Sequence, residues 1–206
     1  RTPIIEGRPP LVGIGDMARR IKNYCRDNAV NLIALGIGLP TFPLPWASTG
    51  QILDVLGEAF MSVPAYLGHN GSYAALAEDW SFGVRQARRW LYVFLGAGIG
   101  GAVVDRGDNK DIPLIRRVET GHVGIDPTGP QCFCGNRGCV ELVASPLSLA
   151  VHAHLSGEQG FERLRDLPEP VTLAASQALG YGLMSIVNVL DLETIVIGGL
   201  EPSLVE

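Results

Sequence analysis

Apolar positions change their spacing several times along the chain, and each change predicts a new helix or strand. Spacings of three and four residues, or alanine-rich faces, predict helices at Gly50–Met61, Ser72–Phe82, Pro146–Leu155 and Val171–Val189. Short apolar runs bounded by glycine, proline or asparagine predict strands at Asn31–Leu39, Val63–Leu67, Leu91–Leu95, Ile99–Val104 and Thr194–Ile197. Helices and strands that alternate in this way are typical of an α/β protein.

Three further predictions concern where elements begin and end. Asp16 is expected to cap a helix on which Met17, Ile21, Tyr24 and Cys25 share one apolar face. The turn-forming residues Gly68–Gly71 predict a domain junction, with a smaller α/β domain at 1–68 and a larger one at 69–206. Gly198 and Gly199 are expected to stop the last strand.

Composition and charge narrow the class of protein. The 206 residues are 47% hydrophobic and 18% charged, which provides a sizeable core and argues against disorder. The formal net charge is -5, and no group of Lys and Arg is dense enough for a nucleic-acid surface. The nearest candidate for such a surface, Arg85, Arg88 and Arg89, is interpreted as a solvated helix end.

No membrane or export signal is predicted. Arg1–Pro10 is polar and proline-rich, unlike a secretory leader. The longest apolar stretch, Trp90–Val104, is too short to cross a bilayer and contains four glycines. We therefore expect a cytoplasmic protein with no membrane partner.

The segment from His122 to Glu141 carries the most specific chemistry. His122, Cys132, Cys134 and Cys139 are one imidazole and three thiols, the usual ligands of a closed tetrahedral zinc site. Turn-forming residues between them let the chain fold the ligands toward one point. A disulfide and free buried thiols are the alternatives, and zinc is favoured over both. A closed site predicts a structural ion, whereas Cys25 is interpreted as a core residue.

Two glycine-rich places could approach a phosphate. Gly96, Gly98 and Gly100 lie between two predicted strands, and Gly198 and Gly199 follow another. A tight hairpin in a packed core needs glycine equally, so both interpretations stay open. No helix follows the first group, which excludes a dinucleotide fingerprint.

Two carboxylates flank the zinc segment. Glu119 precedes His122 by three residues, and Glu141 follows Cys139 by two. Held by a metal loop, such carboxylates can accept hydrogen bonds from neighbouring sugar hydroxyls. Ordinary exposed acids are the alternative, and the sugar interpretation is favoured.

Taken together, these motifs resemble the signature of the ROK family, which includes repressors, uncharacterised reading frames and sugar kinases. The resemblance rests on Glu119-Thr120-Gly121-His122 and on the pattern GxxCxCGxxGCxE at Gly129–Glu141. Leu95–Gly101 is similar to the family's second phosphate motif, and Leu190–Gly199 to its adenosine-side strand and glycine pair. The resemblance covers roughly residues 30 to 200.

The resemblance implies a fold and a binding site. The fold is the actin-like ATPase (ribonuclease H-like) fold, with two α/β domains, an interdomain cleft and a zinc-binding loop at 121–141. Glu119, His122 and Glu141 match the family residues that contact sugar hydroxyls. His122 would then serve the metal through one ring nitrogen and the sugar through the other. A homodimer or tetramer is the oligomer that the family analogy favours.

The chain departs from the family kinases where proton transfer occurs. Kinases carry an Asn-Asp pair before the alanine-rich helix, and the aspartate is the general base; here the pair is His69-Asn70. A carboxamide can bind a hydroxyl but cannot accept its proton. Ala97 replaces a common threonine, and the first phosphate motif, expected before Arg1, is not visible.

The sequence therefore favours a sugar-sensing effector domain of a ROK-type transcriptional regulator over an enzyme. DNA would be bound only by a helix-turn-helix preceding Arg1, an expectation from family analogy. The alternatives are an ATP- and Mg²⁺-dependent sugar kinase of the glucokinase, fructokinase or N-acetylmannosamine kinase type, or an inactive sugar-binding homologue without a DNA role. The identity of the sugar is not encoded in these motifs.

Overall fold

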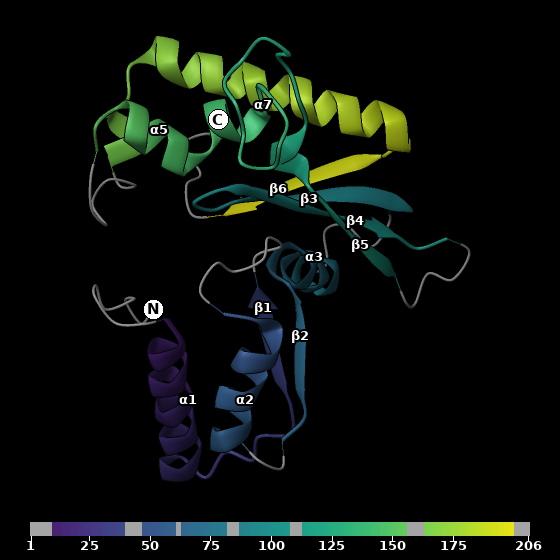
Figure 1. Cartoon of the computed structure of the whole chain (residues 1–206). Coiled ribbons are helices and arrows are strands. Elements are labelled where there is room, and N and C mark those ends of the chain that lie inside the picture. Colours follow the sequence, from purple (N-terminus) through teal and green to yellow (C-terminus); the bar gives the residue numbers. More distant parts are fainter. Residues whose placement is uncertain are drawn as a thin grey trace. The chain divides into compact units, whose positions relative to one another are not determined.

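A computed structural model describes residues 10–39, 47–60, 63–81, 87–107, 113–155 and 163–199 (Figure 1). The chain divides into two compact units, Arg1–Asn70 and Gly71–Glu206. Each unit has its own cluster of buried apolar side chains. Both are built from helices and strands, as the alternating pattern predicted.

The first unit is a parallel strand pair with two helices. Its elements are α1 (Pro10–Asp27), β1 (Leu35–Leu39), α2 (Thr49–Ala59) and β2 (Ala65–His69). β1 and β2 are parallel, with Leu35 opposite Ala65 and Leu39 opposite His69, so α2 lies on the connection between them.

Helix α2 begins and packs as its sequence predicts. The Ser48 hydroxyl accepts the backbone N–H of Gln51, and the Gln51 side chain accepts the backbone N–H of Ser48. This capping box satisfies two donors that would otherwise lack partners. Ile52, Leu56 and Phe60 are buried, whereas Val55, which shares their helical spacing, is only partly buried.

The prediction for α1 was wrong at its start and on its face. The helix begins at Pro10, so Asp16 lies inside it and forms an ion pair with Arg19 instead of a cap. The packed residues are Leu11, Ile14 and Ala18, spaced by three and four. Because this face is rotated from the predicted one, the following side chains are exposed: Met17, Ile21 and Tyr24.

The second unit is built on a four-stranded mixed sheet. Its strands are β3 (Arg89–Leu95), β4 (Ile99–Asp105), β5 (Leu114–Val118) and β6 (Thr194–Gly199), in the order β5-β4-β3-β6. β4 is antiparallel to β3 and β5, and β6 is parallel to β3. β5 was not predicted, because the two arginines in this edge strand conceal its apolar positions.

Helices cover both faces of this sheet (Figure 1). The helices are α3 (Asn70–Trp80), α4 (Val140–Ala144), α5 (Pro146–His152) and α7 (Glu169–Leu190), with short 3₁₀ turns η1 (Thr120–His122) and η2 (Arg163–Asp166). Leu91 and Val93 pack on the side of α4, α5 and α7, whereas Trp90 and Tyr92 pack with Ala75 of α3. β3 is therefore buried on both faces, which explains its unbroken apolar sequence.

Two predicted turns are regular structure. β2 continues to His69 and α3 begins at Asn70, so Gly68–Gly71 is not a turn. β6 continues through Gly198 to Gly199, because Leu95 at the end of β3 still pairs with Gly199. The glycine pair therefore forms the last two residues of β6, which is described as far as Gly199.

Helix α7 is long and apolar enough to cross a membrane by length and composition alone. One side of it, including Leu179, Leu183 and Ile186, is buried in the core of the second unit. A core helix passes the same test, so α7 is explained by its packing on the sheet.

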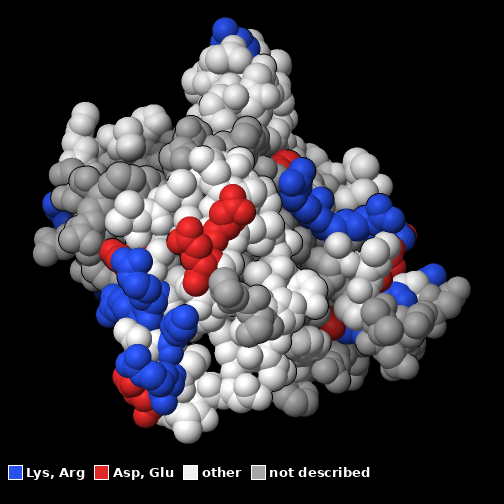
Figure 2. Space-filling model, turned by 60° about the horizontal axis from the view of Figure 1, so that its bottom comes forward, with Lys and Arg blue, Asp and Glu red and all other residues white. Residues whose placement is uncertain are grey.

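The arginine group near residue 89 is not a helix end. Arg89 is the first residue of β3, and its guanidinium lies 2.7 Å from the Asp105 carboxylate. Arg85 lies outside the described residues. Figure 2 shows the basic side chains of one face in separate groups, divided by uncharged surface and accompanied by acids.

Candidate functional site

The four predicted metal ligands lie together in the second unit. The ligand atoms of His122, Cys132, Cys134 and Cys139 are all within 4.8 Å of one another. His122 Nδ1 is 3.5 Å from Cys132 Sγ, and Cys134 Sγ is 3.6 Å from Cys139 Sγ. Zinc bonds of about 2.0–2.3 Å give tetrahedral edges of about 3.5–3.8 Å. The four cysteines are free, and this arrangement favours a metal site over a disulfide.

Backbone contacts close the loop that carries these ligands. Val140 donates its N–H to the Val123 carbonyl at 3.0 Å, and Ile125 donates to the Gly138 carbonyl at 2.9 Å. Gly138 has a positive φ of 55°, and a Cβ there would lie 1.9 Å from the Asp126 carbonyl oxygen. Only glycine fits this crossing, so the turn residues of the motif have a steric purpose.

A tight turn presents the first two cysteines. The N–H of Gly135 bonds to the Cys132 carbonyl at 3.0 Å, and the N–H of Cys132 bonds to the Asn136 carbonyl at 2.8 Å. Gly135 has a φ of 94°, a conformation that suits glycine. Cys132 and Cys134 therefore lie on one tight turn, and the Sγ of Cys139 lies 3.6 Å from that of Cys134.

The thiols have opposed tendencies to ionise. Burial raises the pKa of Cys139 to about 12, with further contributions from the neighbouring thiols. The backbone N–H of Asn136 holds the pKa of Cys134 below its ordinary value. A bound divalent cation would supply the positive charge that keeps all three as thiolates. The donor set and its spacing thus fit a closed, structural zinc ion.

The two candidate carboxylates have different surroundings. Glu141 lies in the first turn of α4, and its Oε2 accepts the backbone N–H of Ile99 at 2.8 Å. Glu119 precedes η1 and lies 3.3 Å from the Arg117 guanidinium, with 38% of its side chain exposed. Glu141 is therefore part of the internal structure, whereas Glu119 faces solvent.

Each of three glycines in the β3–β4 hairpin has a packing reason. A Cβ on Gly96 would lie 2.6 Å from the Phe94 ring, and one on Gly98 would lie 2.8 Å from Glu141 Oε2. A Cβ on Gly101 would lie 2.1 Å from Thr120 Oγ1. Gly100 lies in β4 opposite Phe94. These contacts explain the glycines without a phosphate, and both interpretations remain compatible with the hairpin.

Gly198 and Gly199 border the same end of the sheet. A Cβ on Gly198 would lie 2.4 Å from the Tyr92 hydroxyl oxygen. Gly199 has a φ of 152°, and a Cβ there would lie 1.9 Å from the Leu95 carbonyl oxygen. Both positions therefore bring the β6 backbone close to β3.

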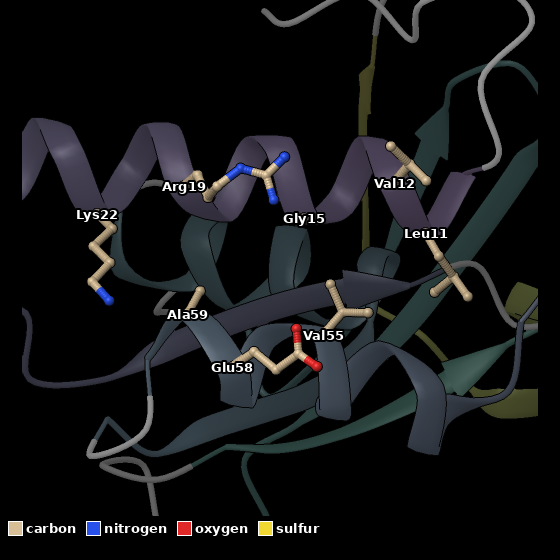
Figure 3. A pocket seen from close by; sticks show the side chains of 8 residues that line it. All are labelled: Leu11, Val12, Gly15, Arg19, Lys22, Val55, Glu58 and Ala59. Carbon is tan, nitrogen blue, oxygen red and sulfur yellow. The ribbon is translucent and has the colours of Figure 1, made fainter.

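His69 and Asn70 belong to the first unit, and the other candidate site residues belong to the second. His69 ends β2, Asn70 begins α3, and both are half-buried. The first unit also contains a groove of about 540 Å³ between α1 and α2 (Figure 3). Its walls include Arg19, Lys22 and Glu58, and no candidate site residue lines it.

Sequence reasoning missed the structural importance of Gly121. A Cβ there would lie 2.6 Å from the Ile99 carbonyl oxygen and 2.8 Å from Glu141 Oε2. The neighbouring Thr120 is buried, and its hydroxyl has no hydrogen-bond partner among the residues that the structure describes. The sequence feature that could have singled out Thr120 and Gly121 is their position inside the motif Glu119–His122.

The fold is α/β with a mixed sheet, which fits structural neighbours that are sugar kinases of the actin-like ATPase fold. The ROK family model matches residues 46–200, three quarters of the chain. The chain belongs to the ROK family.

Known relatives include both regulators and kinases. The chain is 34% identical over 112 residues to the DNA-binding transcriptional repressor Mlc of Escherichia coli, covering 53% of this chain and 28% of the repressor. It is 38% identical over 140 residues to a glucokinase of Thermotoga maritima, covering 68% of this chain and 40% of the glucokinase. The ROK hexokinase structure from Thermus thermophilus aligns with a TM-score of 0.64 at 27% identity, covering 97% of this chain and 72% of the hexokinase chain. The chain spans less than two thirds of the length of these curated relatives.

Proposed function

We propose that this chain is the sugar-sensing part of a ROK-family transcriptional regulator that does not phosphorylate its sugar. The observation that carries the proposal is Asn70 at the first position of α3, where family kinases have a general-base aspartate. Similarity to the repressor Mlc supports the regulator, and similarity to glucokinases supports a sugar as the ligand.

In this proposal the sugar is held by hydrogen bonds to its hydroxyls. His122 directs Nδ1 toward Cys132, so the metal would use that nitrogen and the sugar the other. Glu119 would accept hydroxyls through its exposed carboxylate. Glu141 has already committed one oxygen to Ile99, which leaves its remaining acceptor capacity for the sugar. His69 and Asn70 remain candidate sugar contacts from the family resemblance alone.

The change at residue 70 separates binding from catalysis. An amide can donate to and accept from a sugar hydroxyl, so affinity for the sugar survives. It cannot take the proton that the hydroxyl must lose during attack on a phosphate. General-base assistance is typically worth about 10²–10⁴-fold in rate. A sensor needs the first property and gains from losing the second, because it does not consume its signal.

A kinase assay on the whole gene product tests the proposal. We expect calorimetry to detect binding of one hexose from a panel containing glucose, fructose and N-acetylmannosamine, with ADP release at background for every sugar. Asn70→Asp is expected to raise ADP release. Asn188→Asp, which adds the same charge on an exposed part of α7, should not. Robust turnover by the unmodified protein would overturn the proposal.

The second candidate is an ATP- and Mg²⁺-dependent ROK sugar kinase. The relatives that favour it include the glucokinase of Thermotoga maritima and an N-acetylmannosamine kinase of Haemophilus influenzae, the latter 31% identical over 183 residues. It would use the β3–β4 hairpin and the Gly198–Gly199 pair as nucleotide contacts. The ADP-release assay distinguishes it from the sensor directly.

The DNA-binding role is tested separately. We propose that any DNA contact is made by a helix-turn-helix preceding Arg1, in a cytoplasmic protein that forms a dimer or tetramer. The sequence before Arg1 is expected to contain that motif, and a mobility-shift assay with promoter DNA is expected to respond to the sugar. A sugar-binding gene product without a DNA-binding segment would favour the inactive homologue.

A further inference from the structure

We propose that Glu141 is a positioning residue that couples the metal loop to the β3–β4 hairpin, so that metal binding holds the hairpin backbone in place. This role is additional to a sugar contact and does not depend on one. It rests on contacts within the second unit alone.

The first step is the direct contact between Glu141 and the hairpin. Oε2 of Glu141 accepts the N–H of Ile99, the first residue of β4, at 2.8 Å. A carboxylate acceptor makes this a charge-assisted hydrogen bond, which is stronger than a bond between neutral groups. The residues between the strands, Gly96–Gly98, therefore have one end fixed by a side chain from a distant part of the chain.

The second step is the space kept open for this carboxylate. A Cβ on Gly98 or on Gly121 would lie 2.8 Å from the same Oε2 atom. Two glycines from separate elements thus leave room for a single oxygen. An acid that was merely exposed would need no such clearance on two sides.

The third step connects Glu141 to the metal ligands. Cys139 is the N-cap residue of α4, and Glu141 follows it by two residues in the first helical turn. The position of this five-residue helix depends on what holds its ends, because so short a helix is not stable by itself. Cys139 anchors the start of α4, and buried apolar residues are its other anchors: Val140 packs against Gly182 of α7, and Ala144 is buried at the end of the helix.

A second contact joins the same two regions. The N–H of Leu147, at the start of α5, donates to the carbonyl of Ala97 in the hairpin at 3.0 Å. Ser145, between α4 and α5, accepts the N–H of Ser148 and so fixes the start of α5. The hairpin is therefore held on both sides of Gly98 by α4 and α5, which directly follow the metal ligand Cys139 in the chain.

Binding or loss of the metal should consequently change how firmly the hairpin backbone is held. With the metal bound, Cys139 fixes the start of α4 and directs Glu141 at Ile99. When the metal is removed, one anchor of α4 is lost and the Glu141–Ile99 bond opens more often. In a nucleotide-binding homologue the same contact would order the backbone that faces the phosphates.

Hydrogen exchange of the backbone amides measures this coupling without activity. The zinc-loaded whole gene product is compared with the same protein after chelation, and the peptide containing Ile99 is followed by mass spectrometry. We expect exchange at Ile99 to be about ten- to hundredfold faster after zinc removal, in line with loss of a charge-assisted hydrogen bond. Metal content is measured in each sample.

Two substitutions at Glu141 test whether this residue couples the metal loop to the hairpin. Glu141→Ala should give fast exchange at Ile99 whether or not zinc is bound, while zinc content stays near one ion per chain. Glu141→Gln keeps an acceptor oxygen and should restore an intermediate protection. If Glu141→Ala fails to fold, Gly98→Ala tests the same contact, because its added Cβ displaces the carboxylate.

Glu193→Gln is the matched control. Glu193 also accepts a backbone N–H, that of Arg88 at 3.0 Å, at the opposite end of β3. Its replacement should leave both the protection of Ile99 and its response to zinc unchanged.

Two outcomes would overturn the coupling. One is equal exchange at Ile99 with and without zinc in the unmodified protein. The other is a zinc response that persists in Glu141→Ala. Binding of glucose, fructose and N-acetylmannosamine is measured in parallel by calorimetry. A protein that binds none of them but shows the zinc response at Ile99 contradicts the proposed sugar sensor and supports the coupling through Glu141.

Discussion

The two ends of the four-stranded sheet are built by different physical means. At the end where β3 and β6 finish, the backbone turns through glycines and is fixed by the Glu141 carboxylate. At the other end, charged side chains form ion pairs, Arg89 with Asp105 and the buried Arg106 with Asp79. The first end is shaped by close backbone approach at glycines, whereas at the second end ion pairs join neighbouring elements.

The difference concerns which groups fix the backbone at each end. Glycines permit close approach but contribute no side-chain contacts. At the glycine end, the proposed coupling through Glu141 would supply the missing side-chain contact. At the opposite end, ion pairs join Arg89 of β3 to Asp105 of β4, and Arg106, which follows β4, to Asp79 of α3.

The largest expected effect comes from removing a metal ligand. Cys139→Ser should abolish zinc binding and lower the free energy of unfolding by about 3–5 kcal/mol, because metal binding and folding are coupled. For a chain of this size that corresponds to a melting temperature about 10 °C lower. Elemental analysis and thermal unfolding measure both. Cys25→Ser, in α1, is the control and should keep its zinc; equal stability of the two variants would contradict the prediction.

At the charged end, Asp79→Asn should be nearly as damaging. Asp79 and Arg106 are both buried, with side chains 3% and 5% exposed. Removing one charge leaves the other buried without its carboxylate, which typically costs about 3–5 kcal/mol. Urea unfolding should show the loss while zinc content stays unchanged. Asp54→Asn, an exposed acid on α2, should change stability little; a similar loss there would show that the buried pair is not the cause.

The smallest expected effect concerns Asp105 and is dependent on pH. The N–H of Gly107 and the Arg89 guanidinium hold the pKa of Asp105 below its ordinary value. A lowered pKa in the folded state stabilises the protein above the unfolded pKa of about 3.9, and this stabilisation is lost as pH falls through the folded value. Asp105→Asn should therefore cost about 0.5–1 kcal/mol at pH 7. The difference between the two proteins should shrink as pH falls below about 3.9 and through the lowered folded pKa, and a difference that stays constant over this range would exclude the charge as its cause.

Much of the second unit could be predicted from spacing alone. The strands β3 and β4 are apolar on both faces, and the glycines between them allow only a hairpin. β5 was missed because an edge strand with Arg116 and Arg117 has no apolar alternation to detect. The short α4 was missed because five residues contain too little periodicity. The predicted start of α1 was wrong because Asp16, a residue type that often caps helices, pairs with Arg19 inside a longer helix.

The amino-acid sequence by itself determined the α/β class, the ROK signature, and the grouping of His122, Cys132, Cys134 and Cys139. These depend on residue type and local spacing, which act over a few residues. Only the tertiary structure decided that Glu141 bonds to Ile99, 42 positions earlier, and that Gly98 and Gly121 leave space for its carboxylate. Such contacts arise from the packing of distant elements, and no local pattern in the chain encodes them.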